Sequence, residues 1–93
     1  TPDCDCVPWS DAPIVPDIGI LASTDPVALD KACLDLVNKA SGNTNSFFHE
    51  HAHDCKCGDD KFKSMRKDTH GDVQISYGEE IGLGNSEYEL IEI

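Results

Sequence analysis

The sequence predicts a small α/β or α+β domain in which a few helices pack on a short sheet. Residues 18–22 are a short apolar run of the kind found in strands buried on both faces. From Asp25 onward, apolar residues recur at the spacing of an amphipathic helix. Residues 87–90 alternate between acidic and apolar side chains, as an edge strand does. Two more helical segments lie between these elements, so the predicted order is strand, helix, helix, helix, strand.

The length of the chain is sufficient for one domain with a modest core, since the sequence has 93 residues. It begins with Thr1 rather than a methionine, and a cysteine pair follows almost at once. We therefore expect residues 1–93 to be a single domain that forms the C-terminal part of a larger parent protein.

The first helix carries the strongest local signal. Thr24 or Asp25 can cap its first turn, and Pro26 suits the first helical position, where no N–H is needed. The pattern predicts a helix over residues 25–40, ended by the polar residues 41–43. Its predicted core stripe consists of Leu29, Cys33, Leu36 and Ala40, joined by Ala32 and Val37.

The middle of the chain is less regular. Residues 43–58 are polar, rich in His and Cys and without an apolar period, so we expect a loop, or a segment that a metal orders. The carboxylates of residues 59–60 can then cap a short helix that continues to Lys67. Phe62 and Met65 are expected to face inward from this helix.

A further helix is predicted to begin after Thr69 and to end in the glycine-rich residues 82–85. Val73, Tyr77 and Ile81 recur every four residues, which predicts that they form its buried face.

The charge excludes several classes of partner. The net charge is −11, and nucleic-acid binding requires lysines and arginines that neutralise phosphates. Anionic membrane surfaces are excluded by the same reasoning. The sequence contains no apolar run near the ~20 residues of a membrane span and no signal peptide. We expect a cytoplasmic protein.

Cysteine and histidine spacing points to a metal. Four of the five cysteines form two Cys-x-Cys pairs, which favours reduced thiols that serve a metal over a disulfide framework. Thiolates suit zinc and iron–sulfur clusters, and imidazole adds further donors. The candidate metal ligands are Cys4, Cys6, Cys55, Cys57, His51 and His53. The alternatives are free thiols in separate places and a solvated histidine loop.

A second candidate site lies where the predicted strand meets the helix. Ser23, Asp25 and Asp30 would lie at the C-terminal edge of a sheet, where ligands bind in open α/β folds. The alternative is that these side chains only cap the helix and favour its dipole.

Several motifs resemble one known family. They are Cys4-Asp5-Cys6, residues 13–20 (PIVPDIGI) and residues 23–32 (STDPVALDKA), and the likeness continues at residues 35–40, 61–63, 80–84 and 87–90. Together they closely resemble the C-terminal part of the domain of unknown function 362 family. The resemblance implies a parent of several hundred residues with a ferredoxin-like insert that holds iron–sulfur clusters. The closely spaced four-cysteine runs of that insert do not occur here.

Three functions remain open. The first is a domain of an iron–sulfur-associated protein in anaerobic redox or electron transfer, whose partners are the rest of the parent chain and a redox partner. The second is a structural zinc-binding module without a redox role. The third is an enzyme domain with a ligand near Ser23, Asp25 and Asp30, although no recognised catalytic motif supports it.

Overall fold

The computed structural model describes residues 1–4, 6–52, 55–56 and 58–93, and these residues form helices without a strand. The helices are α1 (Pro26–Lys39), α2 (Phe47–His51), α3 (Lys61–Met65) and α4 (Gly71–Glu80). The predicted α/β or α+β class with a short sheet is therefore wrong. Residues 18–22 run in an irregular path, and Ile20 is 102% exposed. A strand buried on both faces needs a strand on each edge, and the described residues form no strand with which this segment could pair.

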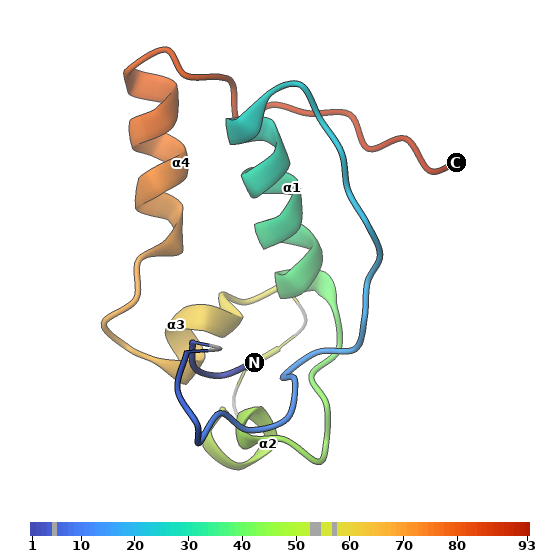
Figure 1. Cartoon of the computed structure of the whole chain (residues 1–93), viewed down its shortest axis with the longest axis vertical. Coiled ribbons are helices and arrows are strands. Elements are labelled where there is room, and N and C mark those ends of the chain that lie inside the picture. The colour runs from blue at the N-terminus through green and yellow to red at the C-terminus, as the bar shows by residue number, and fades with distance from the viewer. Residues whose placement is uncertain (5, 53–54, 57) are drawn as a thin grey trace.

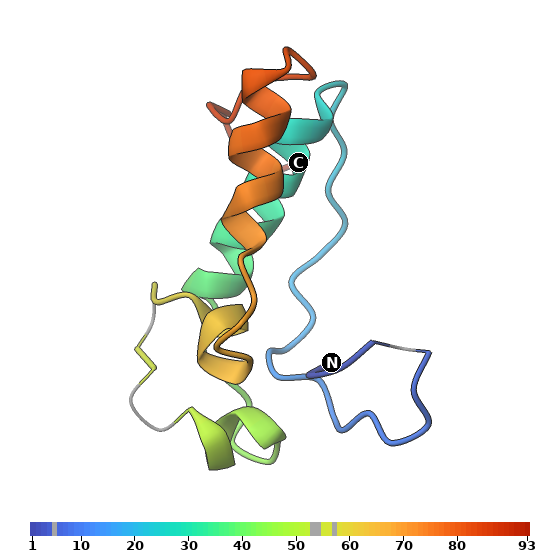
Figure 2. The ribbon, with the colours of Figure 1, turned by 90° about the vertical axis from the view of Figure 1, so that its left-hand side faces the viewer.

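The helices form two groups (Figure 1). α1 and α4 lie side by side along the long axis of the molecule, and the short helices α2 and α3 lie together beyond the C-terminal end of α1. The view from the side shows α4 directly in front of α1 (Figure 2). The N-terminal loop lies beside the short helices, whereas the C-terminal segment leaves from the opposite end of the molecule.

α1 begins as its sequence predicts. Asp25 is the N-cap, and its carboxylate accepts hydrogen bonds from the backbone N–H groups of Val27 at 2.9 Å and Ala28 at 3.0 Å. Pro26 takes the first helical position, where its missing N–H leaves no bond unmade. The helix bounds are confirmed to within one residue at each end.

The buried face of α1 differs from the predicted stripe. Ala32 is buried as predicted, and Val27 and Ala28 are buried beside it. Cys33 is exposed, so the core role predicted for Cys33 is wrong. Leu29 and Leu36 are only half-buried. The reason is the position of α4, which covers the side of α1 that carries Val27 and leaves the opposite side open.

α4 also has the predicted bounds, but the face that it buries is not the predicted one. Ile75 and Gly78 are buried, while Val73, Tyr77 and Ile81 are 55%, 60% and 57% exposed. Gly78 determines which face of α4 packs on α1, because a Cβ atom at this position would lie 2.9 Å from Cγ2 of Val27. The bare glycine backbone lets the two helices approach closely. A glycine contributes nothing to an apolar pattern, so the pattern identified the wrong face.

The short helices enclose a second core, made of Ile14, Phe48, Ala52 and Met65. The prediction of a loop across residues 43–58 is wrong at α2, where Phe48 is 7% exposed. A hydrogen bond from the backbone N–H of Asn43 to the carbonyl oxygen of Ile14, at 2.8 Å, connects the N-terminal loop to this core.

α3 is shorter than predicted. Its N-cap Asp60 accepts a hydrogen bond from the backbone N–H of Lys63 at 2.9 Å, which confirms the predicted acidic start. The helix ends at Met65 rather than at Lys67. Met65 is buried as predicted, but Phe62 is 39% exposed, so its predicted inward position is wrong.

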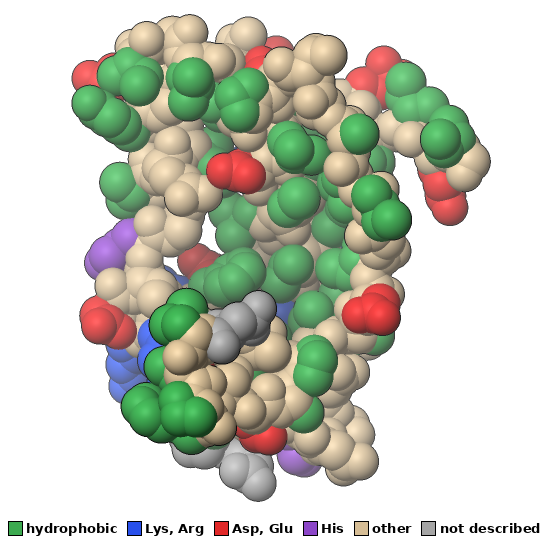
Figure 3. Space-filling view, in the orientation of Figure 1, with side chains coloured by type: hydrophobic (Ala, Val, Ile, Leu, Met, Phe, Trp, Pro, Cys, Tyr) green, Lys and Arg blue, Asp and Glu red, His purple; other side chains and the backbone are tan. Residues whose placement is uncertain are grey.

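Lys and Arg side chains gather on the lower left of the molecule, around α3, whereas Asp and Glu side chains are scattered (Figure 3). Among the helices described, none combines the length and the apolar character that crossing a membrane requires.

Candidate metal-binding thiol site

Cys4 and Cys6 are brought together on the exposed N-terminal loop. Their Sγ atoms lie 2.6 Å apart, with Cys6 donating and Cys4 accepting. The Sγ of Cys4 also accepts a hydrogen bond from the backbone N–H of Cys6 at 3.3 Å. A turn closes around the pair, because the backbone N–H of Val7 donates to the carbonyl oxygen of Cys4 at 3.0 Å. Both sulfurs therefore lie on the same side of the loop.

The hydrogen bond between the thiols changes the acidity of Cys6. Donation from Cys6 to Cys4 raises the pKa of the Cys6 thiol above its usual value, and desolvation by neighbouring atoms raises it further. A metal that binds thiolates must displace this proton, so metal affinity at the pair should increase with pH.

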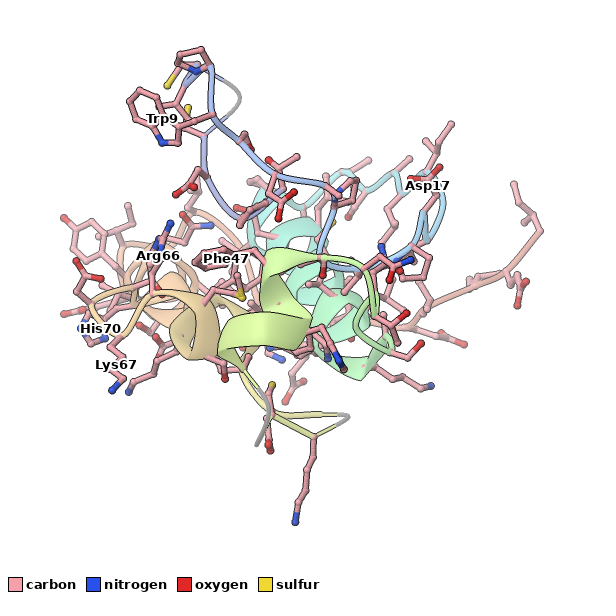
Figure 4. The ribbon with its side chains drawn as sticks, turned by 90° about the horizontal axis from the view of Figure 1, so that it is seen from below. Trp9, Asp17, Phe47, Arg66, Lys67 and His70 are labelled. Carbon is pink, nitrogen blue, oxygen red and sulfur yellow. The ribbon has the colours of Figure 1, made fainter. Side chains whose placement is uncertain are left out.

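The thiol loop is attached to the helices by Arg66, the C-cap of α3. Its guanidinium donates a hydrogen bond to the carboxylate of Asp3 at 2.7 Å, next to Cys4 in the chain. The same guanidinium lies 5.1 Å from the ring centroid of Phe47 in α2, within the range of a cation–π interaction. Figure 4 shows Arg66 beside Phe47, with Trp9 in the loop that carries the sulfurs.

The loop is fixed a second time at its far end. The side-chain amide of Asn43 donates a hydrogen bond to the carbonyl oxygen of Pro13 at 2.8 Å. No sequence pattern indicated either attachment, because Arg66 and Asp3 are 63 residues apart and Asn43 and Pro13 are 30 apart.

The structure does not bring Cys55 to this pair. Cys55 is half-buried and packs against the second core. The described residues contain no group of three or more His, Cys, Asp and Glu side chains that could hold a metal. Residues 55–56 and the N-terminal loop lie on opposite sides of the short helices (Figures 2 and 4).

The other predicted ligands lie outside the described part of the structure. These are Cys57, His53 and the side chain of His51. The closed four-donor site stays a prediction, and the described geometry is that of a two-thiol site.

The second candidate site is dominated by helix capping. Besides the two bonds in the first turn of α1, the Asp25 carboxylate accepts a third from the backbone N–H of Asn85 at 2.8 Å. These backbone bonds, from Ala28 first and Asn85 next, hold the pKa of Asp25 below its usual range. A Cβ atom on Gly84 would lie 2.0 Å from an oxygen of the same carboxylate. The capping interpretation is confirmed for Asp25.

The neighbours of Asp25 also have protein partners. The hydroxyl of Ser23 accepts a hydrogen bond from the backbone N–H of Asp25 at 3.0 Å. Asp30 accepts one from the side-chain amide of Gln74 in α4 at 3.1 Å. A ligand at these three residues stays a prediction.

A cleft of about 460 Å³ lies between α1, α3 and α4, and no sequence pattern pointed to it. It mixes the side chains of Lys63 and His70 with the carboxylates of Asp60 and Asp72. One of these acids is already used, since Asp60 caps α3. The cleft has no convergent set of groups that favours one ligand.

The fold and the site thus define a helical domain with an exposed thiol pair. The model of a family described as Domain of unknown function (DUF362) matches residues 1–35, which include Cys4, Cys6 and the start of α1. The match confirms, over these residues, the resemblance to that family seen in the sequence. No curated protein and no solved structure matches the chain.

Proposed function

We propose that this chain serves an iron–sulfur-associated redox protein, and that Cys4 and Cys6 supply two of the thiolates that hold its metal. The observation that carries the proposal is that the sulfurs of Cys4 and Cys6 lie together on the same side of an exposed loop. Few positions in a protein bring two thiols together in solvent, and soft thiolates are the ligands that iron–sulfur clusters and zinc prefer.

The thiol pair has the right chemistry for zinc or an iron–sulfur cluster, but it provides too few donors. Cys4 and Cys6 provide two donors, whereas structural zinc and most clusters are held by four. The remaining donors would come from another part of the protein or from a partner. When bound, an iron–sulfur cluster supplies one-electron redox chemistry, and the residues of this chain bind and orient it.

The attachment of the loop supports this function. Asp3 is bonded to the C-cap of α3 and Pro13 to the segment between α1 and α2, on either side of the thiol pair, so the sulfurs are held at a defined place on the surface. A ligand pair on a supported loop loses less conformational entropy on binding a metal than a pair on a free chain end would lose.

Metal analysis of anaerobically purified protein tests the proposal. We expect iron, sulfide and visible absorption in the wild type, and their loss in the Cys4→Ser/Cys6→Ser double variant. Cys33→Ser is the matched control, because Cys33 is also an exposed thiol but lies on α1. A colourless protein with zinc lost in the same double variant would instead support the structural zinc module. Equal metal content in all three proteins would refute both.

A further inference from the structure

The separation of the Cys4 and Cys6 sulfurs can be compared with the separations found in a metal site and in a disulfide. Two thiolates on one tetrahedral zinc ion lie ~3.8 Å apart, as bond lengths of ~2.3 Å require. Two sulfurs in a disulfide lie ~2.05 Å apart. The observed 2.6 Å is nearer to the disulfide than to the metal-bound pair. The thiols are thus already close to bonding distance.

We propose that Cys4 and Cys6 form a reversible dithiol–disulfide couple that exchanges with low-molecular-weight disulfides such as glutathione disulfide. This activity goes beyond metal binding and does not require a metal. It follows from the proximity of the two sulfurs and from their exposure, since both cysteines are open to solvent and neither is disulfide-bonded.

The hydrogen bonds assign the two roles. The Sγ of Cys4 accepts from the backbone N–H and from the thiol of Cys6, which assigns Cys4 as the attacking sulfur and Cys6 as the resolving one. The Cys4 thiolate attacks one sulfur of glutathione disulfide, which forms a mixed disulfide and releases one glutathione thiolate. Cys6 then loses its proton to solvent and attacks the Cys4 sulfur, which releases the second glutathione. Two protein thiols are oxidised and one external disulfide is reduced.

Closing this bond leaves the helices in place. The attachments of the loop to the helices, at Asp3 and Pro13, lie outside the ring that the disulfide would close. Exposed disulfides are the ones that thiols reduce readily, so the couple should be reversible. The other thiols that the structure describes lie in different surroundings: Cys33 is exposed on a helix and Cys55 is half-buried against the second core.

The dithiol and the disulfide differ in their ability to bind a metal. Disulfide formation removes two electrons and the negative charges of the two thiolates, and the thiolate is the form that binds metal, so the oxidised pair does not compete as a metal ligand. Oxidation would therefore compete with metal binding at the same two residues.

The chain allows a direct test, because Lys31 is its first basic residue. Trypsin releases residues 1–31, which contain only Cys4 and Cys6, and separates Cys33 into residues 32–39. The full chain is stripped of metal with a chelator, incubated with glutathione disulfide, blocked with an alkylating agent, digested and weighed by mass spectrometry. The Cys6→Ser variant is treated in parallel, and circular dichroism checks that it keeps its helices.

We expect the wild-type peptide 1–31 to be lighter by two hydrogen atoms and to carry no glutathione. The Cys6→Ser peptide should carry one glutathione, because the resolving thiol is missing, and dithiothreitol should reverse both products. The Cys33 peptide, with a single thiol, should carry glutathione and serves as the internal control. The proposal is overturned if wild-type peptide 1–31 accumulates glutathione, or if it stays reduced while the Cys33 peptide is modified. Since the protein is metal-free here, failure of the metal proposal appears only in the metal analysis.

Discussion

The carboxylate of Asp25, at the start of α1, accepts a hydrogen bond from the backbone N–H of Asn85, 60 residues later in the chain, at 2.8 Å. The other oxygen of the same carboxylate caps α1 through Val27 and Ala28. One side chain therefore fixes both the start of α1 and the loop that follows α4. Gly84 allows this arrangement, because any side chain there would overlap the carboxylate.

We predict that Asp25→Ala lowers the thermal unfolding midpoint more than Asp30→Ala, because Asp30 makes a single side-chain bond to Gln74. The pKa of Asp25 is lowered in the folded state, so its contribution to stability is present above the unfolded pKa and is lost as the pH falls through the folded one. The wild type should therefore lose its advantage over Asp25→Ala in acid. Melting curves between neutral pH and pH ~2 measure this. An advantage that does not change with pH would contradict the assignment.

We predict that Gly78→Ala destabilises the protein by about 1 kcal/mol, because overpacking costs ~1–3 kcal/mol and the gain in helix propensity is ~1 kcal/mol. The new Cβ would lie 2.9 Å from Cγ2 of Val27, a buried β-branched side chain with little freedom to rotate. Gly71→Ala is the matched control in the same helix, since its Cβ would meet only Leu34, at an ordinary 3.9 Å. Urea unfolding compares them, and a Gly78→Ala protein as stable as Gly71→Ala would exclude close packing of α1 and α4.

The hydroxyl of Tyr88 donates a hydrogen bond to Asp35 at 2.8 Å, which attaches the C-terminal segment to α1. This bond raises the pKa of Tyr88. Burial would raise the pKa of Asp35, but hydrogen bonds from Lys31 and Tyr88 and the charge of Lys31 lower it. The bond to the phenol should stabilise the fold below the unfolded tyrosine pKa, and this stability should be lost as the pH rises through the folded one.

We therefore predict that Asp35→Asn lowers the pKa of Tyr88 toward that of a free tyrosine. Tyrosinate absorbance is measured during an alkaline titration in a Tyr77→Phe background, which leaves Tyr88 as the one tyrosine in the chain. The Tyr77→Phe protein is the control for the Tyr77→Phe/Asp35→Asn protein. Superimposable titration curves for the two proteins would show that the attachment does not form in solution.

We predict that Arg66→Gln lowers the free energy of unfolding by about 1 kcal/mol, since it removes a partly exposed ion pair and one cation–π contact, each a modest term. The ion pair is discounted because the Arg66 side chain is 42% exposed. Lys67→Gln, which removes the neighbouring exposed charge, should have a smaller effect. The free energies of unfolding of the two variants are measured with denaturant. Equal losses of this free energy would contradict the attachment of the thiol loop by Arg66.

The bounds of α1 and α4 were predictable because they depend on local chemistry. Asp25 and Pro26 define the start of α1 within two residues of sequence. Gly82, with φ of +75°, closes the end of α4 in the left-handed region that favours glycine. The buried faces were not predictable, because they depend on which surfaces meet. Gly78 determines that contact through the absence of a side chain.

The strand predicted at residues 18–22 failed for a related reason. An apolar run indicates that a segment can be buried, but burial needs a partner, and Ile20 has none among the described residues. The thiol pair itself was visible in the spacing of Cys4 and Cys6. Its support by Arg66 was not, because a contact across 63 residues leaves no local pattern.

Cobalt(II) titration of the reduced protein tests most directly whether Cys4 and Cys6 bind a metal, because cobalt bound to thiolate gives a charge-transfer absorption band. We predict this band in the wild type and in Cys33→Ser, and its loss or strong reduction in Cys4→Ser/Cys6→Ser. The band should also strengthen with rising pH, because the metal must displace the proton that Cys6 shares with Cys4. A band of full strength in the Cys4→Ser/Cys6→Ser protein would contradict the claim that this pair binds metal.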